Sequence, residues 1–87
     1  MIYEHEFLQS FLIEFDQLPE DLKDRFIKKI KRLKEEKARR HLKFGLPYFV
    51  ENVTSSARIV YRIEGNKLIF YRCFKNHKEY EKWFNSI

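Results

Sequence analysis

Apolar and polar positions alternate along Arg58–Ile63, which reads RIVYRI. A period of two is typical of a half-buried β-strand. Glu64 follows, and after it Gly65-Asn66 tolerate the backbone angles of a two-residue hairpin turn. Lys67–Tyr71 then returns as a second strand, with its apolar residues facing those of the first. The pattern predicts a hairpin with one apolar face and one face that carries arginines.

Two amphipathic helices are predicted before this hairpin. Phenylalanines recur every four residues at positions 7, 11 and 15, which is an apolar stripe at helical spacing. The segment Leu18-Pro19-Glu20-Asp21 separates the helices, because proline and acidic residues suit the first turn of a helix. The second helix is expected to run to about Lys37, with an apolar stripe at Leu22, Phe26, Ile30 and Leu33. We expect the two helices to form an antiparallel pair.

The remaining segments complete an α+β fold. Ile2–Glu6 is predicted as a short edge strand, Leu46–Val53 as a further strand, and His77 as the start of a last amphipathic helix. The expected element order is therefore βααβββα, with a two-helix hairpin on one face of a small antiparallel sheet and a C-terminal helix. No repeat or linker divides the chain, so residues 1–87 are expected to form a single domain.

The charge of the chain favours an anionic partner. Lysine and arginine number 18 against 13 acidic residues, which gives a net charge of +5 on 87 residues. This excess suits a nucleic acid or an acidic protein, although surfaces rich in Lys and Glu also serve stability alone. Cys73 is the single cysteine, and no apolar run has the pattern of a membrane span or signal peptide. We expect a cytoplasmic protein with no disulfide, metal, cofactor or membrane partner.

Three segments resemble the RelE/ParE superfamily of toxins from type II toxin–antitoxin systems. They are Leu18-Pro19 before the long helix, LKFGL at Leu42–Leu46, and RIVYRI at Arg58–Ile63, of which the last two look most like the YoeB branch. The resemblance covers nearly the whole chain and implies a toxin held inactive by an acidic cognate antitoxin, which docks a helical segment. Most RelE-like members enter the ribosomal A site and cut mRNA there, whereas the ParE branch inhibits DNA gyrase.

The resemblance also implies candidate catalytic residues. Arg58 matches a strand arginine that stabilises phosphate charge, and Lys43 matches the lysine of the YoeB Leu-Lys pair. His77 and Tyr80 resemble the H-x-x-Y ending of the HigB and YafQ branches, in which the histidine transfers a proton, and Tyr80 would stack on a base or assist that transfer. Lys78 falls where RelE itself carries a catalytic arginine. Such groups would cleave RNA without a metal, by deprotonating the 2′-oxygen, stabilising the phosphate charge and protonating the 5′-oxygen.

Four further basic residues are candidates for RNA binding. Arg40 and His41 belong to a basic segment that is predicted as a loop, and His41 is a second possible proton-transfer group. Arg62 shares a strand face with Arg58, so it would extend the track of phosphate contacts. Arg72 lies near the end of the second hairpin strand, where strict alternation places it on the opposite face of the sheet.

Each assignment has a structural alternative. Arg58 would instead pair with Glu51 or Glu64, Tyr80 would belong to the core, and the other candidates would be solvated loop or helix-start side chains. The chain also departs from its relatives, because the YoeB glutamate is missing and the tyrosine follows His77 by three residues rather than the five of RelE. The leading interpretation is a ribosome-dependent mRNA endoribonuclease. The alternatives are a ParE-like gyrase inhibitor without nuclease activity and a catalytically weak relative.

Overall fold

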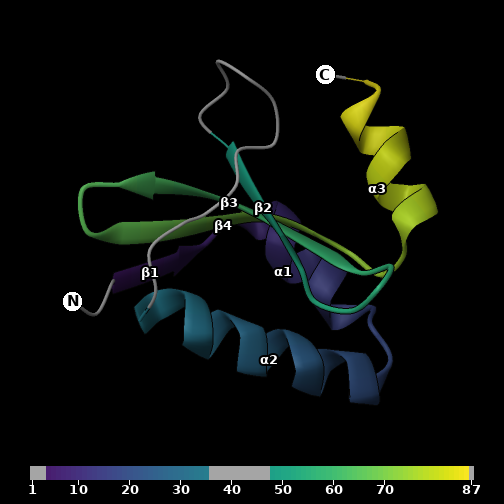
Figure 1. Cartoon of the computed structure of the whole chain (residues 1–87), viewed down its shortest axis with the longest axis horizontal. Coiled ribbons are helices and arrows are strands. Elements are labelled where there is room, and N and C mark those ends of the chain that lie inside the picture. Colours follow the sequence, from purple (N-terminus) through teal and green to yellow (C-terminus); the bar gives the residue numbers. More distant parts are fainter. Residues whose placement is uncertain (1–3, 36–47, 87) are drawn as a thin grey trace.

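The chain folds into a four-stranded sheet with helices on both faces (Figure 1). The computed structural model describes residues 4–35 and 48–86. Its elements are β1 (Glu4–Phe7), α1 (Gln9–Asp16), α2 (Glu20–Glu35), β2 (Tyr48–Asn52), β3 (Arg58–Glu64), β4 (Lys67–Phe74) and α3 (His77–Phe84). The predicted α+β class and the order βααβββα are confirmed. No helix in the described part of the chain is both long and apolar enough to cross a membrane.

The sheet has the strand order β1-β4-β3-β2. β2 pairs with β3, and β3 with β4, in antiparallel fashion. β1 runs parallel to β4, from Glu4 opposite Lys67 to Phe7 opposite Phe70. The sheet is therefore mixed, whereas the sequence pattern predicts a wholly antiparallel one. Two helices and two strands separate β1 from β4 along the chain, which lets the chain return and place β4 beside β1 in the same direction.

The predicted hairpin joins β3 and β4. Glu64 pairs with Lys67 across the turn, and Gly65 has a φ of +61°. Gly65 is the one residue with positive φ in the described part of the chain. A positive φ at the first turn position alone fits a type II′ turn, which glycine adopts without steric penalty.

The main core lies between the sheet and the pair α1–α2. Phe26 of α2 is fully buried, and Phe11 of α1 packs against Phe70 of β4 with 5.7 Å between the ring centroids. The stripe predicted for α2 is confirmed, since its buried residues are Phe26, Ile30 and Leu33. The stripe predicted for the first helix begins too early, because Phe7 ends β1 and α1 starts only at Gln9.

A second, smaller core lies between the other face of the sheet and α3. Val50, Val60 and Phe74 are buried there, and the half-buried aromatic residues packed on them are Tyr48, Tyr71, Tyr80, Trp83 and Phe84. α3 begins at His77 as predicted, where Oδ1 of Asn76 accepts a hydrogen bond from the N–H of Glu79 at 2.9 Å. No residue of α3 is fully buried, so this helix is attached through one aromatic side only.

A β-bulge in β4 changes which face Arg72 occupies. Tyr61 pairs with Phe70 and Val60 with Arg72, which leaves Tyr71 as the extra residue. Arg72 consequently lies on the α3 face of the sheet, opposite Val60. The expectation from strict alternation is wrong here, because one inserted residue reverses the facing of every residue after it.

Candidate active site

Three of the predicted catalytic residues come together where β3 begins beneath α3. The guanidinium carbon of Arg58 lies 6.0 Å from the ring centroid of Tyr80. The ring of Tyr80 in turn lies 5.8 Å from that of His77. The last two residues are neighbours because positions three apart share one side of a helix. A fixed cation, an aromatic ring and an imidazole thus form one cluster on the α3 face of the sheet.

Arg58 is held in place by backbone carbonyls. Its Nη1 donates hydrogen bonds to the carbonyl oxygens of Thr54, Ser55 and Ala57, at 3.3, 3.2 and 3.0 Å. These contacts fix the guanidinium over the turn between β2 and β3 without neutralising its charge. A positioned cation of this kind stabilises developing negative charge better than a mobile one.

The alternative in which Arg58 pairs with Glu51 or Glu64 is wrong. Glu51 lies 3.5 Å from Nζ of Lys29, and Glu64 lies 2.9 Å from Nη2 of Arg62. Among residues 4–35 and 48–86, no carboxylate forms an ion pair with Arg58. Its charge is therefore available to an anionic ligand.

His77 is open to solvent on the first turn of α3. Its Nε2 lies 3.2 Å from Oε1 of Glu81, and both side chains are about half exposed. The carboxylate can orient the imidazole while leaving its other nitrogen accessible. Lys78 is also exposed, but adjacent helix positions point in different directions, so it does not share the side of α3 that carries His77 and Tyr80.

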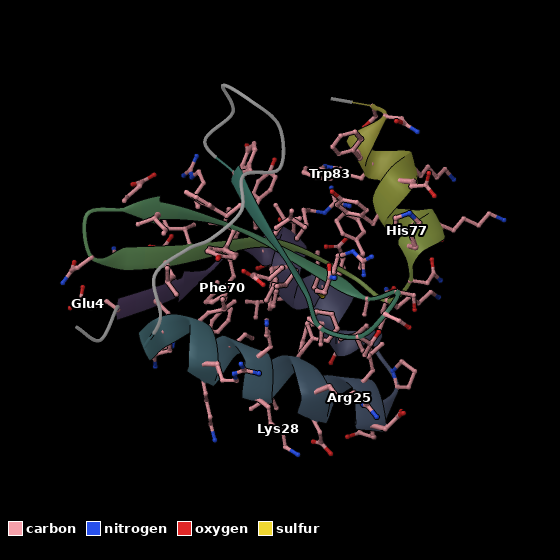
Figure 2. All side chains as sticks on the ribbon, viewed as in Figure 1. Glu4, Arg25, Lys28, Phe70, His77 and Trp83 are labelled. Carbon is pink, nitrogen blue, oxygen red and sulfur yellow. The ribbon has the colours of Figure 1, made fainter. Side chains whose placement is uncertain are left out.

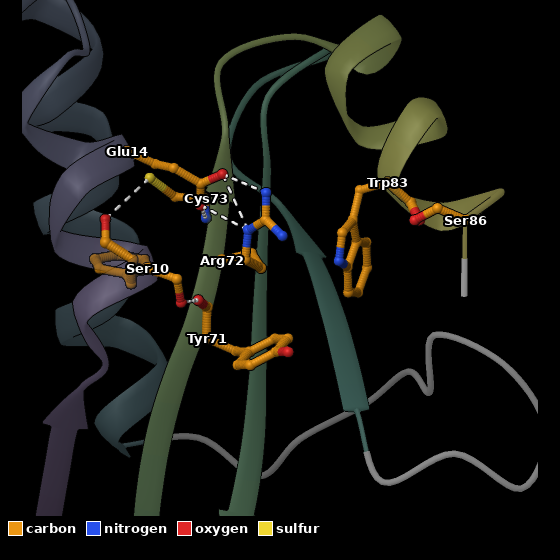
Figure 3. Close-up of polar contacts among 8 residues, drawn as sticks. Ser10, Glu14, Tyr71, Arg72, Cys73, Trp83 and Ser86 are labelled. Atoms are coloured by element: carbon orange, nitrogen blue, oxygen red, sulfur yellow. Dashed lines mark hydrogen bonds and ion pairs between the residues drawn. The ribbon is translucent and has the colours of Figure 1, made fainter.

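Arg72 lies between the carboxylate of Glu14 and the ring of Trp83 (Figure 3). Its Nη2 is 2.7 Å from Oε2 of Glu14, and its Nε is 3.0 Å from both carboxylate oxygens. Its guanidinium carbon lies 5.0 Å from the ring centroid of Phe74 and 5.7 Å from that of Trp83. The hydrogen bonds that Arg72 donates to the carboxylate of Glu14 are the main reason that the pKa of Arg72 is raised. This arrangement favours a structural role, in which Arg72 links α1, β4 and α3.

Solved structures identify the fold. No protein-family model and no curated protein matches this sequence. The toxin–antitoxin complex RelBE2 from Mycobacterium tuberculosis matches with a TM-score of 0.78 and 16% identity over 88% of this chain and 94% of that one. A double mutant of the E. coli toxin RelE in the free state matches with a TM-score of 0.79 and 18% identity over 98% of this chain and 93% of that one. The chain has the RelE toxin fold.

A copper-bound mutant toxin from Helicobacter pylori is a more distant match to the same fold. Its TM-score is 0.63 and its identity 18%, over 90% of this chain and 98% of that one. At identities of 16–18%, the comparisons establish the fold, so the chemistry is argued from the residues of the site.

Within the RelE fold, an aromatic group that the sequence did not single out adjoins the site. Tyr48 of β2 stacks on Tyr71 of β4 with 4.9 Å between ring centroids, and each ring meets Trp83 edge-on at 6.3 Å. Burial raises the pKa of Tyr48, and its hydrogen bond with Tyr71 adds to the shift. Arg62 lies opposite Tyr48 in the sheet, with its Nη2 paired to Glu64. The alternation of residues along β2 predicts a strand, but it does not predict which strands lie near it. The stacking of Tyr48 on Tyr71 therefore could not be predicted from the sequence.

Three candidates, Lys43, Arg40 and His41, lie outside the described residues. Their roles remain those that the family resemblance implies. In the described ranges, no group of three or more His, Cys, Asp or Glu side chains is arranged to hold a metal ion.

The Glu14 carboxylate also accepts a hydrogen bond from the backbone of β4, on the edge that β1 leaves uncovered. β1 ends at Phe7, so the later residues of β4 pair with β3 on one side but have no strand on the other. On that open side, Ser10 Oγ donates to the carbonyl of Tyr71 at 2.7 Å, and Glu14 Oε1 accepts from the N–H of Cys73 at 3.0 Å. Glu14→Ala would leave the Cys73 N–H and Arg72 without these bonds. We expect it to lower the free energy of unfolding by about 1–3 kcal/mol in urea titrations. Asp16→Ala, at an exposed position of the same helix, is the control and should change it by less than about 0.5 kcal/mol.

The Cys73 thiol is predicted to be inert in the native protein. Burial raises its pKa to about 12 from an ordinary value of 9.0, with a further contribution from the negative charge of Glu14. Iodoacetamide at pH 8 should therefore modify Cys73 much more slowly in buffer than in 8 M urea, because the thiolate is the reacting form. Equal alkylation rates in the two solvents would contradict this.

The raised pKa of Cys73 also makes the stability of the fold depend on pH. Below pH 9 the thiol is protonated in both the folded and the unfolded state. Between pH 9 and 12 only the unfolded state ionises, so the free energy of unfolding falls as pH rises.

Proposed function

We propose that this protein is the toxin of a type II toxin–antitoxin system and inhibits translation by cutting mRNA in the ribosomal A site, without a metal ion. The observation that carries the proposal is the cluster of Arg58, Tyr80 and His77. Binding alone would not need an exposed titratable imidazole beside a fixed guanidinium and an aromatic ring. Transfer of a phosphoryl group between the two oxygens of an RNA linkage needs a group that transfers protons, such as the imidazole, and a cation that stabilises phosphate charge, such as the guanidinium.

The proposed reaction divides among these residues. The 2′-oxygen of one nucleotide attacks the adjacent phosphorus, the bond to the 5′-oxygen breaks, and the products are a 2′,3′-cyclic phosphate and a 5′-hydroxyl. Arg58 would stabilise the extra negative charge on the phosphate oxygens, and His77, oriented by Glu81, would transfer a proton. Tyr80 would stack on a base of the codon. Lys43 is a further phosphate ligand by resemblance.

Primer extension on an mRNA that is being translated in a cell-free system tests the proposal. We expect cuts at the A-site codon with the wild-type protein, no cuts when ribosomes are omitted, and loss of the cuts with Arg58→Ala. An intact message with uninterrupted protein synthesis would refute the nuclease assignment. A gyrase supercoiling assay would then examine the ParE-like alternative.

An antitoxin partner is supported by an apolar groove on the opposite side of the molecule from α3. Its volume is about 300 Å³, and it lies between β1, α1 and α2, lined by His5, Phe7, Phe11, Leu12, Phe15, Ile27, Ile30, Lys31 and Lys34. Leu12 is 46% exposed and Ile27 42% exposed, which is unusual for large apolar side chains. An amphipathic helix with acidic flanks would cover these residues and meet the two lysines.

Paired variants test this groove. Leu12→Asp with Ile27→Asp should weaken binding of the co-expressed antitoxin at least tenfold in isothermal titration calorimetry, because two buried carboxylates would replace two apolar contacts. Ile13→Asp is the control, since Ile13 is 51% exposed but does not line the groove. Equal weakening by both variants would place the antitoxin elsewhere on the protein.

A further inference from the structure

The Arg72 side chain joins two helices that lie on opposite faces of the sheet. Its guanidinium donates hydrogen bonds from two nitrogens to the carboxylate of Glu14 in α1, at 2.7 to 3.0 Å. The same group lies 5.7 Å from the ring centroid of Trp83 in α3. α1 packs in the main core and α3 on the other face, so this link passes around the edge of β4 that β1 leaves uncovered.

The helix at the far end of this link, α3, is held by fewer buried residues than α1 or α2. None of its residues is fully buried, and its aromatic side is what contacts the sheet. Figure 2 shows Trp83 on the side of α3 that faces the sheet. The Trp83 ring lies 5.5 Å from that of Phe74 and 6.3 Å from those of Tyr48 and Tyr71. Because so few groups hold α3, the contact of Arg72 with Trp83 contributes strongly to the tilt of the helix.

The tilt of α3 decides where two residues of the candidate site lie. His77 and Tyr80 belong to this helix, and the ring of Tyr80 lies 6.0 Å from the guanidinium carbon of Arg58. Arg58 is fixed independently by the carbonyls of the turn before β3. A rotation of α3 about its first turn would therefore move the imidazole relative to the cation. A misplacement of about 1 Å in a reacting group can lower a rate by roughly 10²-fold.

A guanidinium suits this task because its geometry is directional. Its planar fork meets a carboxylate with two parallel hydrogen bonds, and its face stacks on an aromatic ring. An apolar side chain of similar volume can stabilise a fold as well as an ion pair does, but it does not set the angle between two elements. The pair is also partly shielded from solvent, since the side chains of Arg72 and Glu14 are only 27% and 25% exposed.

We propose that Arg72, held by Glu14, is a positioning residue that sets the place of His77 and Tyr80 through its contact with Trp83. The residue acts on α3 and does not touch the substrate. A direct contact with RNA phosphate is less well supported, because Glu14 already compensates the charge of Arg72. The inference rests on the proposed function, since the reaction whose rate Arg72 would set is the cleavage of mRNA.

The single tryptophan of the chain, Trp83, reports the position of α3. Quenching of its fluorescence by acrylamide is compared in the wild type, in Arg72→Met and in the control Lys67→Met. Lys67 lies at the other end of β4, where it pairs with Glu6 at 3.5 Å. Each variant loses one ion pair and one positive charge, so both carry a net charge of 5 − 1 = +4. Circular dichroism establishes that both are folded.

We expect the quenching constant of Trp83 to rise by about twofold or more in Arg72→Met, because a less firmly held helix exposes its ring more often. The single-turnover rate of mRNA cleavage at saturating protein should fall by about 10- to 100-fold, while the half-saturating concentration stays within about threefold. Lys67→Met should resemble the wild type in all three measurements.

Two results for folded Arg72→Met would overturn the proposal. Unchanged quenching with an unchanged maximal rate would show that Arg72 contributes to stability alone. A raised half-saturating concentration with an unchanged maximal rate would show that Arg72 binds RNA phosphate.

Glu14→Gln provides a second variant for the same measurements, also in the event that Arg72→Met does not fold. The amide oxygen can still accept from the N–H of Cys73, but the charge that holds Arg72 is lost. Quenching should rise and the maximal rate should fall, though less than in Arg72→Met. The double variant should be no slower than Arg72→Met, because the two residues act as one unit. Independent, additive losses would contradict this.

The fluorescence measurement separates this inference from the proposed function. A wild type that cuts no mRNA would refute the nuclease assignment, whereas the quenching of Trp83 would still show whether Arg72 holds α3. Cleavage by the wild type with equal rates in Arg72→Met and Lys67→Met would leave the nuclease assignment in place and refute the role of Arg72.

Discussion

His77→Ala is expected to reduce the rate of mRNA cleavage on the ribosome by about 10²- to 10⁴-fold, which is the usual effect of removing a proton-transfer group. His77 is solvent-accessible, paired with Glu81 and adjacent to the ring of Tyr80. Single-turnover cleavage of a programmed ribosome complex measures the effect. Because the side chain is exposed, the stability of the fold should change little.

His5→Ala is the matched control for this experiment. His5 is exposed on β1, at the edge of the sheet away from α3, and its removal should leave the cleavage rate within about twofold. If His77→Ala also retained the wild-type rate, His77 would be an ordinary helix-start residue, and the proton would have to be transferred by another group.

Phe70→Ala is expected to destabilise the fold by about 3–5 kcal/mol. Phe70 is fully buried in β4, and its ring contacts those of Phe7, Phe11 and Tyr61 at 5.1, 5.7 and 6.0 Å between centroids. Domains of this size have about 5–15 kcal/mol of total stability, so the variant would be close to unfolding at 37 °C. Urea denaturation followed by circular dichroism gives the difference directly.

The comparison is Phe84→Ala, in which a half-buried ring of the smaller core is removed. We expect a loss well below that of Phe70→Ala, because α3 has no fully buried residue. Equal losses would show that the α3 side of the sheet contributes as much to stability as the α1–α2 side.

Local features of the fold could be predicted because they depend on a few adjacent residues. The alternation in Arg58–Ile63 and the turn at Gly65 define the β3–β4 hairpin, and the spacing of Phe26, Ile30 and Leu33 defines α2. The start of α3 at His77 follows from an asparagine in the position of a helix cap.

Features that depend on pairing between distant segments could not be predicted. The parallel pairing of β1 with β4 and the bulge that turns Arg72 toward α3 are set by register across the sheet. The same applies to the contact of Arg58 with the turn carbonyls and to the stacking of Tyr48 on Tyr71. Alternation along one strand carries no information about its partner.

The candidate site could be predicted from the sequence only in part. The family resemblance predicts Arg58, His77 and Tyr80, and the fold brings these three residues together. Arg72 was a candidate for RNA binding, but its charge is compensated by Glu14.

The most direct test of the central claim is the chemistry of the cut ends. Messages carrying a single 2′-deoxynucleotide at the scissile position are translated beside unmodified messages, and the 3′ ends of the fragments are analysed by mass spectrometry. The account predicts a 2′,3′-cyclic phosphate on fragments of the unmodified message and no cut at the deoxy position, because the 2′-oxygen is the nucleophile. Cleavage at the deoxy position, or fragments ending in a 3′-hydroxyl, would contradict it.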